Sequence, residues 1–440
     1  MIGLIITLFL FPLIGWSLAR RSLGEAFLLG VGLTGSLLFL AGVAHVPLVP
    51  TLVLVVVCGL GCVVWAYRRR RISSPSLTPS TSYPLLPTFL MALPLFAITF
   101  IVTTTPLSDF DGRAFWVLKA KGIAHERAID GPFFRGATLD PRNQYPLLIP
   151  LDGAVIMGVA HDLDDRQLRW LYVGLLTALA LLVRERIGRL VSPSAGAWCA
   201  ALLVWIPQFA VETEGGVMSA YNDIALAAFA AGAFFELVSA VVQPRDSATA
   251  RLRDRETARP RHDMFRFGLW LAFLVLTKSE GLPFALVFLI IAATVFRKRI
   301  VVPAIVTAVA TAALFVWRMR VPVGDEEDVV RLLPTIPEKL HHIGEALAAF
   351  PRHMLLLPRW GAFWIVVIIA AAFALRVDRR AAGLAVAVIA SMLAVYAGVY
   401  VATAWVVSDL IAVTADRLLM HVIAPSLFLL ALAAQRTKSM

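Results

Sequence analysis

Long apolar runs alternate with short polar segments along almost the whole chain. Thirteen runs reach or approach the roughly 17–25 residues that a membrane-spanning α-helix needs. They are continuously apolar, without the period of two that marks the strands of a transmembrane β-barrel. The pattern predicts an all-α, polytopic membrane protein. The predicted spans cover residues 1–18, 25–46, 50–67, 86–104, 167–183, 194–210, 221–241, 265–279, 282–296, 300–317, 361–375, 382–404 and 417–434.

Two long loops interrupt this succession of spans, at residues 105–166 and 318–360. Within the first loop, residues 147–159 are apolar but short for a bilayer crossing. We expect them to form a juxtamembrane helix lying at the membrane interface. Tyr145 would anchor this helix and Pro146 would separate it from the preceding loop.

A linker separates the first three predicted spans from the rest. Residues 73–85 are rich in Ser, Thr and Pro, a composition that favours flexible chain. The sequence therefore predicts an N-terminal three-helix membrane unit at 1–72 and a larger membrane domain at 86–440. We find no internal repeat of the kind on which many secondary transporters are built.

Composition and charge give the predicted protein a location and an orientation. The chain is 59% hydrophobic, against about 45–50% in soluble domains, and its net charge is +11. Its arginines form short clusters between apolar runs, which does not favour nucleic-acid binding. If the cluster at 68–71 is cytoplasmic, every other basic cluster between spans falls on the same side. This predicts a multi-pass protein of the cytoplasmic (inner) membrane, with its N-terminus and both long loops outside and its C-terminus inside.

Polar residues gather at the outer ends of the predicted spans. In a chain this apolar, such residues usually mark a substrate pathway or a catalytic site. The most informative are Asp109 and Asp111, two carboxylates that follow the span at 86–104. The other candidates are Trp116, Lys119, Lys121, Tyr145, Asn222, Asp223, Lys278, Glu280, Arg417 and His421.

Each candidate also has a purely structural explanation, which the sequence leaves open. Asp109 and Asp111 can cap the next helix or lie solvated in the loop. Lys119 and Lys121 can extend to lipid headgroups. The remaining alternatives are a helix cap at Asn222 and Asp223, a turn salt bridge between Lys278 and Glu280, pairing of Arg417 with Asp416, and a packed core histidine at His421.

These residue types suit one kind of chemistry. A carboxylate at the membrane edge can act as general base toward a hydroxyl or amine. Nearby cations can hold a phosphate, Arg as a fork of donors and Lys as a point charge. A base and a phosphate clamp at the outer leaflet suit a donor linked to a lipid phosphate. The pair at 109 and 111 can also bind Mg²⁺ or Mn²⁺ through its oxygens, so a divalent cofactor stays open.

The order of these motifs resembles that of a known family. Asp111 lies five residues before Trp116 and is followed by Lys-Ala-Lys at 119–121. This arrangement resembles bacterial integral-membrane glycosyltransferases of the GT-C superfamily, which are related to protein mannosyltransferases and lipid A aminoarabinose transferases. Further look-alikes are Tyr-Pro-Leu-Leu-Ile-Pro-Leu at 145–151, Tyr-Asn-Asp at 221–223, Lys-Ser-Glu-Gly at 278–281 and Asp-Arg-Leu-Leu at 416–419.

The resemblance covers about residue 86 to the C-terminus and implies a GT-C-like fold for that domain. It implies an enzyme that transfers a hexosyl or pentosyl group from a polyprenyl-phosphate donor to a cell-envelope acceptor, with inversion, outside the cytoplasm. Asp111 matches the family's catalytic base, and Asp109 would be a supporting acid. In the protein mannosyltransferase branch the loop acids are adjacent, which puts a protein acceptor in doubt, and three helices precede the family's usual first span.

Two other classes of function are kept as alternatives. A secondary transporter or flippase for an anionic envelope precursor would carry its polar residues near the bilayer midplane, on broken helices. A non-catalytic scaffold of an envelope complex would leave Asp109 and Asp111 facing water, with no site behind them.

Overall fold

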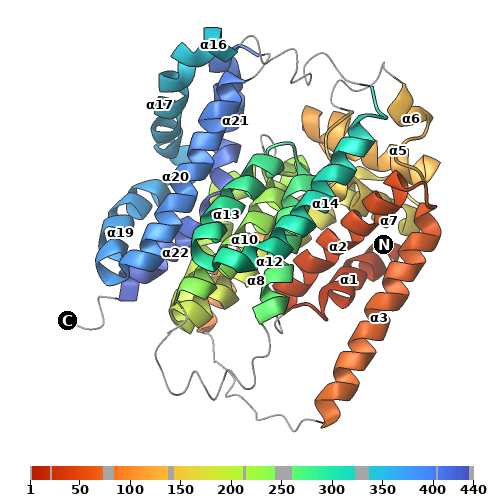
Figure 1. Ribbon diagram of the computed structural model, residues 1–440, viewed down its shortest axis with the longest axis horizontal. Helices are drawn as coiled ribbons and strands as arrows, with labels where there is room; N and C mark the ends of the chain where they lie inside the picture. Colours follow the sequence, from red (N-terminus) through yellow and green to blue (C-terminus); the bar gives the residue numbers. More distant parts are fainter. Residues whose placement is uncertain are drawn as a thin grey trace.

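The computed structural model describes residues 2–19, 22–72, 84–136, 143–211, 215–242, 260–322, 336–402 and 405–435. Helices make up 84% of the structure, and the described residues contain no strand, which confirms the all-α class. Figure 1 shows the helices as one body. In its first half these are α1 (Ile2–Gly15), α2 (Leu23–Val43), α3 (Leu48–Ile72), α4 (Leu85–Thr104), α5 (Leu118–Glu126), α6 (Pro132–Arg135), α7 (Leu148–Ala160), α8 (Asp165–Leu190) and α9 (Pro193–Trp205). The second half contains α10 (Asp223–Val242), α12 (Pro260–Thr277), α13 (Gly281–Phe296), α14 (Val301–Arg318), α16 (Ile336–Lys339), α17 (Ile343–Met354), α18 (Leu357–Trp360), α19 (Phe363–Val377), α20 (Arg379–Val401), α21 (Val407–Met420) and α22 (Ile423–Gln435).

The helices follow the predicted apolar runs closely. Each of the first twelve predicted spans coincides with one helix. Among the described residues, five helices are long and apolar enough to cross a membrane: α2, α4, α10, α14 and α20. The pair α21–α22 passes the same test together, and seven further helices contain apolar stretches of 10–17 residues. These lengths fit a multi-pass membrane protein, while thirteen crossings remain a prediction.

The last predicted span, at residues 417–434, is wrong because two helices occupy this region instead of one continuous helix. A helix begins already at Val407, ends at Met420 and is followed by a second one from Ile423, bent by 51°. Arg417 therefore lies in the last turn of α21 rather than at the start of a span. The helix macrodipole favours a cation at a helix C-terminus, so it stabilises the positive charge of Arg417 at this position.

The short apolar helix α7 exists where it was predicted, but it is not a surface helix. Residues 148–157 are all buried, enclosed by α1, α2, α5 and α8. An interfacial helix would leave one face exposed. Glycine makes the close approach to α2 feasible, because a Cβ on Gly35 would lie 2.7 Å from the carbonyl oxygen of Leu148.

The N-terminal helices α1 and α2 pack directly against the larger domain. Four buried charged side chains join α2 to α8, α10 and α12. Arg186 lies 2.6 Å from Glu25 and 2.8 Å from Glu236, and Arg266 lies 3.3 Å from Glu25 and 2.7 Å from Glu236. We call these four residues the Glu25 network. Two arginines that supported the predicted orientation are thus neutralised inside the protein.

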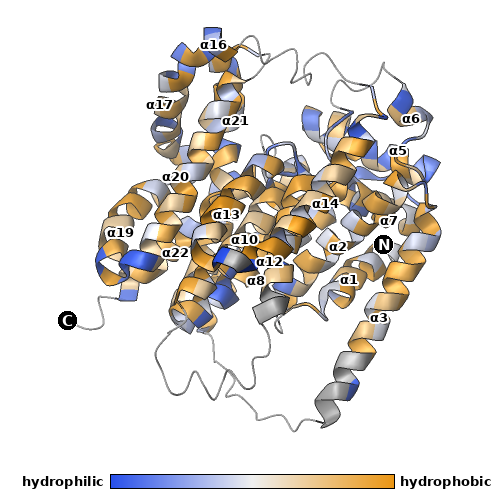
Figure 2. Ribbon diagram, viewed as in Figure 1, coloured by the Kyte–Doolittle hydropathy of each residue, from blue (hydrophilic) through white to orange (hydrophobic). Residues whose placement is uncertain are grey.

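Hydrophobic residues dominate the middle of the helices, and hydrophilic residues gather toward their ends (Figure 2). In Figures 1 and 2, the short helices α5 and α6 and the pair α16–α17 lie at the upper end of the molecule. The polar candidates described below belong to the same end as α5 and α21.

Candidate functional site

A buried ion cluster lies where α10, α13 and α21 begin or end. The Nζ of Lys278 is 2.8 Å from Asp223 Oδ1 and 3.2 Å from Glu280 Oε1. His421, at the break between α21 and α22, brings its Nε2 to 3.3 Å from the same Asp223 oxygen. Three helix termini therefore bring two acids and a lysine together around one histidine. The turn salt bridge between Lys278 and Glu280, which was the structural alternative for these two residues, is present, and Asp223 extends it.

Arg417 lies beside this cluster, over the ring of Tyr221, with its Cζ 5.0 Å from the ring centroid. The backbone before α10 is folded tightly against it. Gly215 has φ +94°, and a Cβ there would lie 2.7 Å from Arg417 Cβ. A side chain at this position would be strained and would displace Arg417.

Asp109 and Asp111 approach the same arginine from the loop after α4. The Tyr221 hydroxyl interacts with both carboxylates. Asp109 is buried and its Oδ1 accepts a hydrogen bond of 2.8 Å from the Gly112 N–H, so it caps the π-helical turn Gly112–Val117. Burial, reinforced by the neighbouring Asp111, raises the pKa of Asp109, while the Gly112 N–H and Arg417 oppose that rise. Asp111 is less buried than Asp109.

These contacts define the Arg417 group. Several of its buried polar atoms lack hydrogen-bond partners within the described residues, namely Arg417 Nε, Asp223 Oδ2 and Glu280 Oε2. Buried polar atoms are nearly always satisfied, so a cluster of exceptions indicates a place for a polar ligand or water. Donors and acceptors are both present, which suits hydroxyl groups. The members of the group are Asp109, Asp111, Tyr221, Asp223, Lys278, Glu280, Arg417 and His421.

A second set of candidates forms an aromatic cage around a lysine. Lys119 is fully buried, with its Nζ 5.6 Å from the Trp116 ring and 5.4 Å from the Tyr145 ring. The two rings lie 5.6 Å apart. This lysine does not extend toward headgroups. Because α5 continues the π-helical turn after Asp111, the cage and the Arg417 group share one segment of chain.

Two candidates have structural partners. Lys121 forms an ion pair with Asp165 in the first turn of α8. Asn222 accepts a hydrogen bond from the Tyr172 hydroxyl at 3.1 Å and donates one to the Thr277 carbonyl at 3.2 Å. Both side chains connect helices of the described structure, and neither is needed to explain the unsatisfied atoms.

Residues outside the sequence-based set complete the site. Asp416 accepts a hydrogen bond of 3.0 Å from the Trp360 indole and lies 3.1 Å from His353 Nδ1. This contact joins the second long loop to α21 next to Arg417. The Tyr396 hydroxyl meets His421 Nδ1. Only the Asp-Arg pair at 416–417 signalled this arrangement, because Tyr396 lies within an apolar run and His353 shows no ligand spacing.

A divalent metal stays a prediction. Within the described residues, no group of three or more His, Cys, Asp or Glu side chains is arranged to hold a metal ion. Asp109 and Asp111 instead share the Tyr221 hydroxyl.

No protein-family model, curated protein or solved structure matches this chain. The functional argument therefore depends on the residues themselves.

Proposed function

We propose that this protein is a membrane glycosyltransferase that moves a sugar from a polyprenyl-phosphate donor to a cell-envelope acceptor. It would act at the outer face of the cytoplasmic membrane, in a GT-C-like fold with about thirteen spans. The observation that carries the proposal is the Arg417 group itself. Two carboxylates, an arginine and several unsatisfied buried polar atoms converge at the ends of four helices.

The roles follow from the surroundings of each side chain. Asp109 is occupied as a cap, so the more accessible Asp111 is the better general base. Lys278 is already paired with two acids, so Arg417 is the better phosphate ligand. The unsatisfied oxygens of Asp223 and Glu280 would accept hydrogen bonds from sugar hydroxyls.

The proposed step is a single displacement at the anomeric carbon. Asp111 takes the proton of the acceptor hydroxyl. The oxygen of that hydroxyl forms a bond to the anomeric carbon at the same time. The bond from the anomeric carbon to the phosphate oxygen breaks, and its electron pair leaves with the polyprenyl phosphate. Arg417 stabilises the charge that gathers on the departing phosphate, a contribution that increases in the transition state.

The direct test is to incubate purified protein with a panel of polyprenyl-phosphate sugars and an envelope acceptor extract, with and without EDTA. Release of polyprenyl phosphate supports the proposal. Comparison of the reactions with and without EDTA shows whether transfer requires a divalent metal ion. Asp409 on α21 is an exposed carboxylate at the same end of the molecule. Asp409→Asn is therefore a matched control for Asp111→Asn.

One observation favours a second function, transport of an anionic precursor. The break between α21 and α22 sets His421 and Asp223 together deep among helices, and transporters use broken helices in this way. Proteoliposomes distinguish the two functions. Movement of a labelled lipid-linked precursor across the bilayer without bond cleavage would favour transport.

A further inference from the structure

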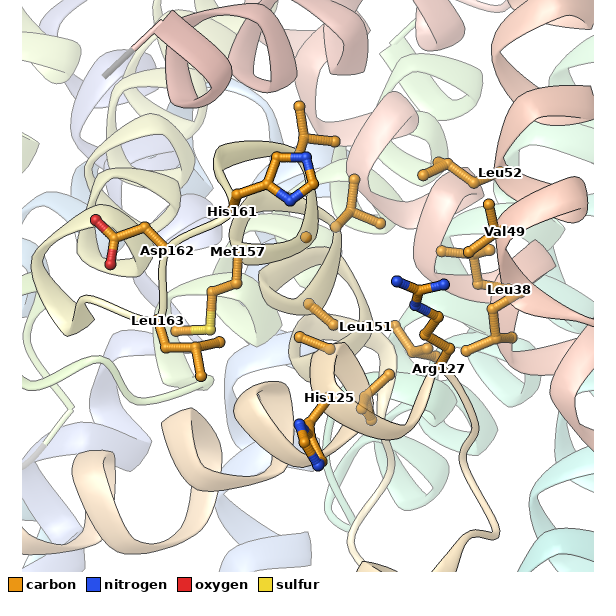
Figure 3. Close-up of a pocket in the computed structure, with 17 residues that line it drawn as sticks. Leu38, Val49, Leu52, His125, Arg127, Leu151, Met157, His161, Asp162 and Leu163 are labelled. Atoms are coloured by element: carbon orange, nitrogen blue, oxygen red, sulfur yellow. The ribbon is translucent and has the colours of Figure 1, made fainter.

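A cavity of about 520 Å³ lies between α2 and α3 on one side and α5 and α7 on the other (Figure 3). No residue of the Arg417 group lines it. This volume falls within the range of about 300–1,000 Å³ that is usual for small-molecule sites. Its walls are mostly apolar. They include Leu38, Val49, Leu52, Leu151, Val155 and Met157.

One cation extends into this apolar space. Arg127 ends α5 in a left-handed conformation with φ 55°, and its guanidinium reaches toward Leu38 and Val49 (Figure 3). His161 ends α7 in the same conformation, with φ 52°, and its ring also lies at the cavity. A cation is favoured at a helix C-terminus, so the end of α5 stabilises the charge of Arg127 there.

The acid next to Arg127 in the chain and the acid in the cavity lining are both engaged elsewhere. Asp162 points away from the cavity and accepts hydrogen bonds from the Asp164 N–H at 3.1 Å and the Gln167 amide at 2.5 Å. Glu126 accepts a 2.7 Å hydrogen bond from the Phe133 N–H. Within the described residues, no ion pair involves Arg127. An unpaired cation above an apolar cavity is complementary to an anion that carries a hydrocarbon chain.

We infer that this cavity binds one anionic membrane phospholipid, with its phosphate at Arg127 and an acyl chain along α3 and α7. The membrane presents such lipids to the cavity at high concentration. A second cavity of about 450 Å³, among α1, α2, α4 and α8, has no charged residue in its lining, so it lacks a headgroup ligand.

The site would give the N-terminal helices a role that the proposed function does not supply. Leu38, Val49 and Leu52 form one wall, and α5, which follows the Asp111 turn, forms part of the other. A lipid held there stabilises the contact between the first three helices and the segment that carries Asp111. Ligands that bind only the folded state raise its stability.

The test measures lipid binding directly, by native mass spectrometry of the purified protein titrated with phosphatidylglycerol, phosphatidylcholine or a polyprenyl phosphate. Two variants probe the two parts of the site. Arg127→Gln removes the cation, and Gly158→Leu fills the cavity, because a Cβ on Gly158 meets nothing within 4 Å. The matched controls are Arg135→Gln on α6 and Gly383→Leu on α20, which is equally open.

We expect Arg127→Gln to weaken phosphatidylglycerol binding about tenfold, and Gly158→Leu to abolish it. Both controls should bind like the wild type, and phosphatidylcholine should bind more weakly than phosphatidylglycerol. Unchanged phosphatidylglycerol binding in either test variant would overturn the inference. Stronger binding of the polyprenyl phosphate, lost in the same two variants, would also overturn it and assign the cavity to a carrier lipid. None of these readouts depends on transferase activity.

Discussion

The guanidinium of Arg417 lies over the ring of Tyr221, whose hydroxyl interacts with Asp109 and Asp111. The tyrosine therefore connects the proposed phosphate ligand to the proposed base. Its ring holds the planar guanidinium by a cation–π contact, which an ammonium group cannot reproduce with the same geometry.

Arg417→Lys is expected to lower kcat/KM for the donor by about 10- to 100-fold, because it keeps the charge but loses the paired donors. Steady-state kinetics with purified variants measure this. Arg135→Lys on α6 is a matched substitution at an exposed site. Equal activity of Arg417→Lys and the wild type would remove Arg417 from the phosphate role.

The ion pair between Asp223 and Lys278 should dominate the stability of the site. Lys278→Met leaves Asp223 buried without its lysine, which is expected to cost about 3–5 kcal/mol of folding free energy. Adding Asp223→Leu should restore much of that loss, because two apolar side chains replace two charges. Thermal melting in detergent gives the comparison, and simple additivity of the two substitutions would contradict the account.

The Glu25 network lies away from the Arg417 group, and we expect its loss to lower the free energy of unfolding strongly. Arg186→Met leaves Glu25 and Glu236 with a single buried arginine, and we expect a loss of about 3–5 kcal/mol. Arg189 forms a more exposed pair with Glu185 on the same helix, so Arg189→Met should cost about 0.3–0.5 kcal/mol. Similar melting temperatures for the two variants would refute the importance of the network.

The raised pKa of Asp109 gives a signed pH dependence. Because its folded-state pKa lies above its unfolded value, Asp109 contributes stability at low pH that is lost as pH rises through the folded pKa. Asp109→Asn cannot ionise and still offers an oxygen to the Gly112 N–H. Its melting temperature should exceed that of the wild type at neutral pH, and the difference between the two should shrink as the pH is lowered. A difference in melting temperature that grows as the pH is lowered would contradict a raised pKa of Asp109.

Much of the fold was predictable from the apolar pattern. Runs of apolar residues located twelve helices. The pattern failed where a local feature intervened. The sequence predicts one span over residues 194–210, yet α9 ends at Trp205 because Pro207 disfavours helix at the preceding residue. The break at 421–422 lies four residues before Pro425, which has no N–H to bond the carbonyl of residue 421. His421 packs against Tyr396 and Asp223 at this break.

The site was only partly predictable, for a related reason. Its charged members could be found because charge is rare in this chain, and Asp223, Lys278 and Arg417 do meet. Pairing between different helices could not be predicted, because it depends on which helices are neighbours. Lys121 has the same sequence signature as Lys119, but Lys121 pairs with Asp165 while Lys119 lies in the aromatic cage.

The central claim is that Asp111 is the base of a lipid-linked sugar transfer. The most direct measurement is polyprenyl-phosphate release by purified Asp111→Asn, beside the wild type and Asp409→Asn, with a donor that the wild type uses. We predict a loss of at least about 100-fold for Asp111→Asn, with unchanged melting temperature, and full activity for Asp409→Asn. Wild-type rates in the Asp111→Asn variant would contradict the account.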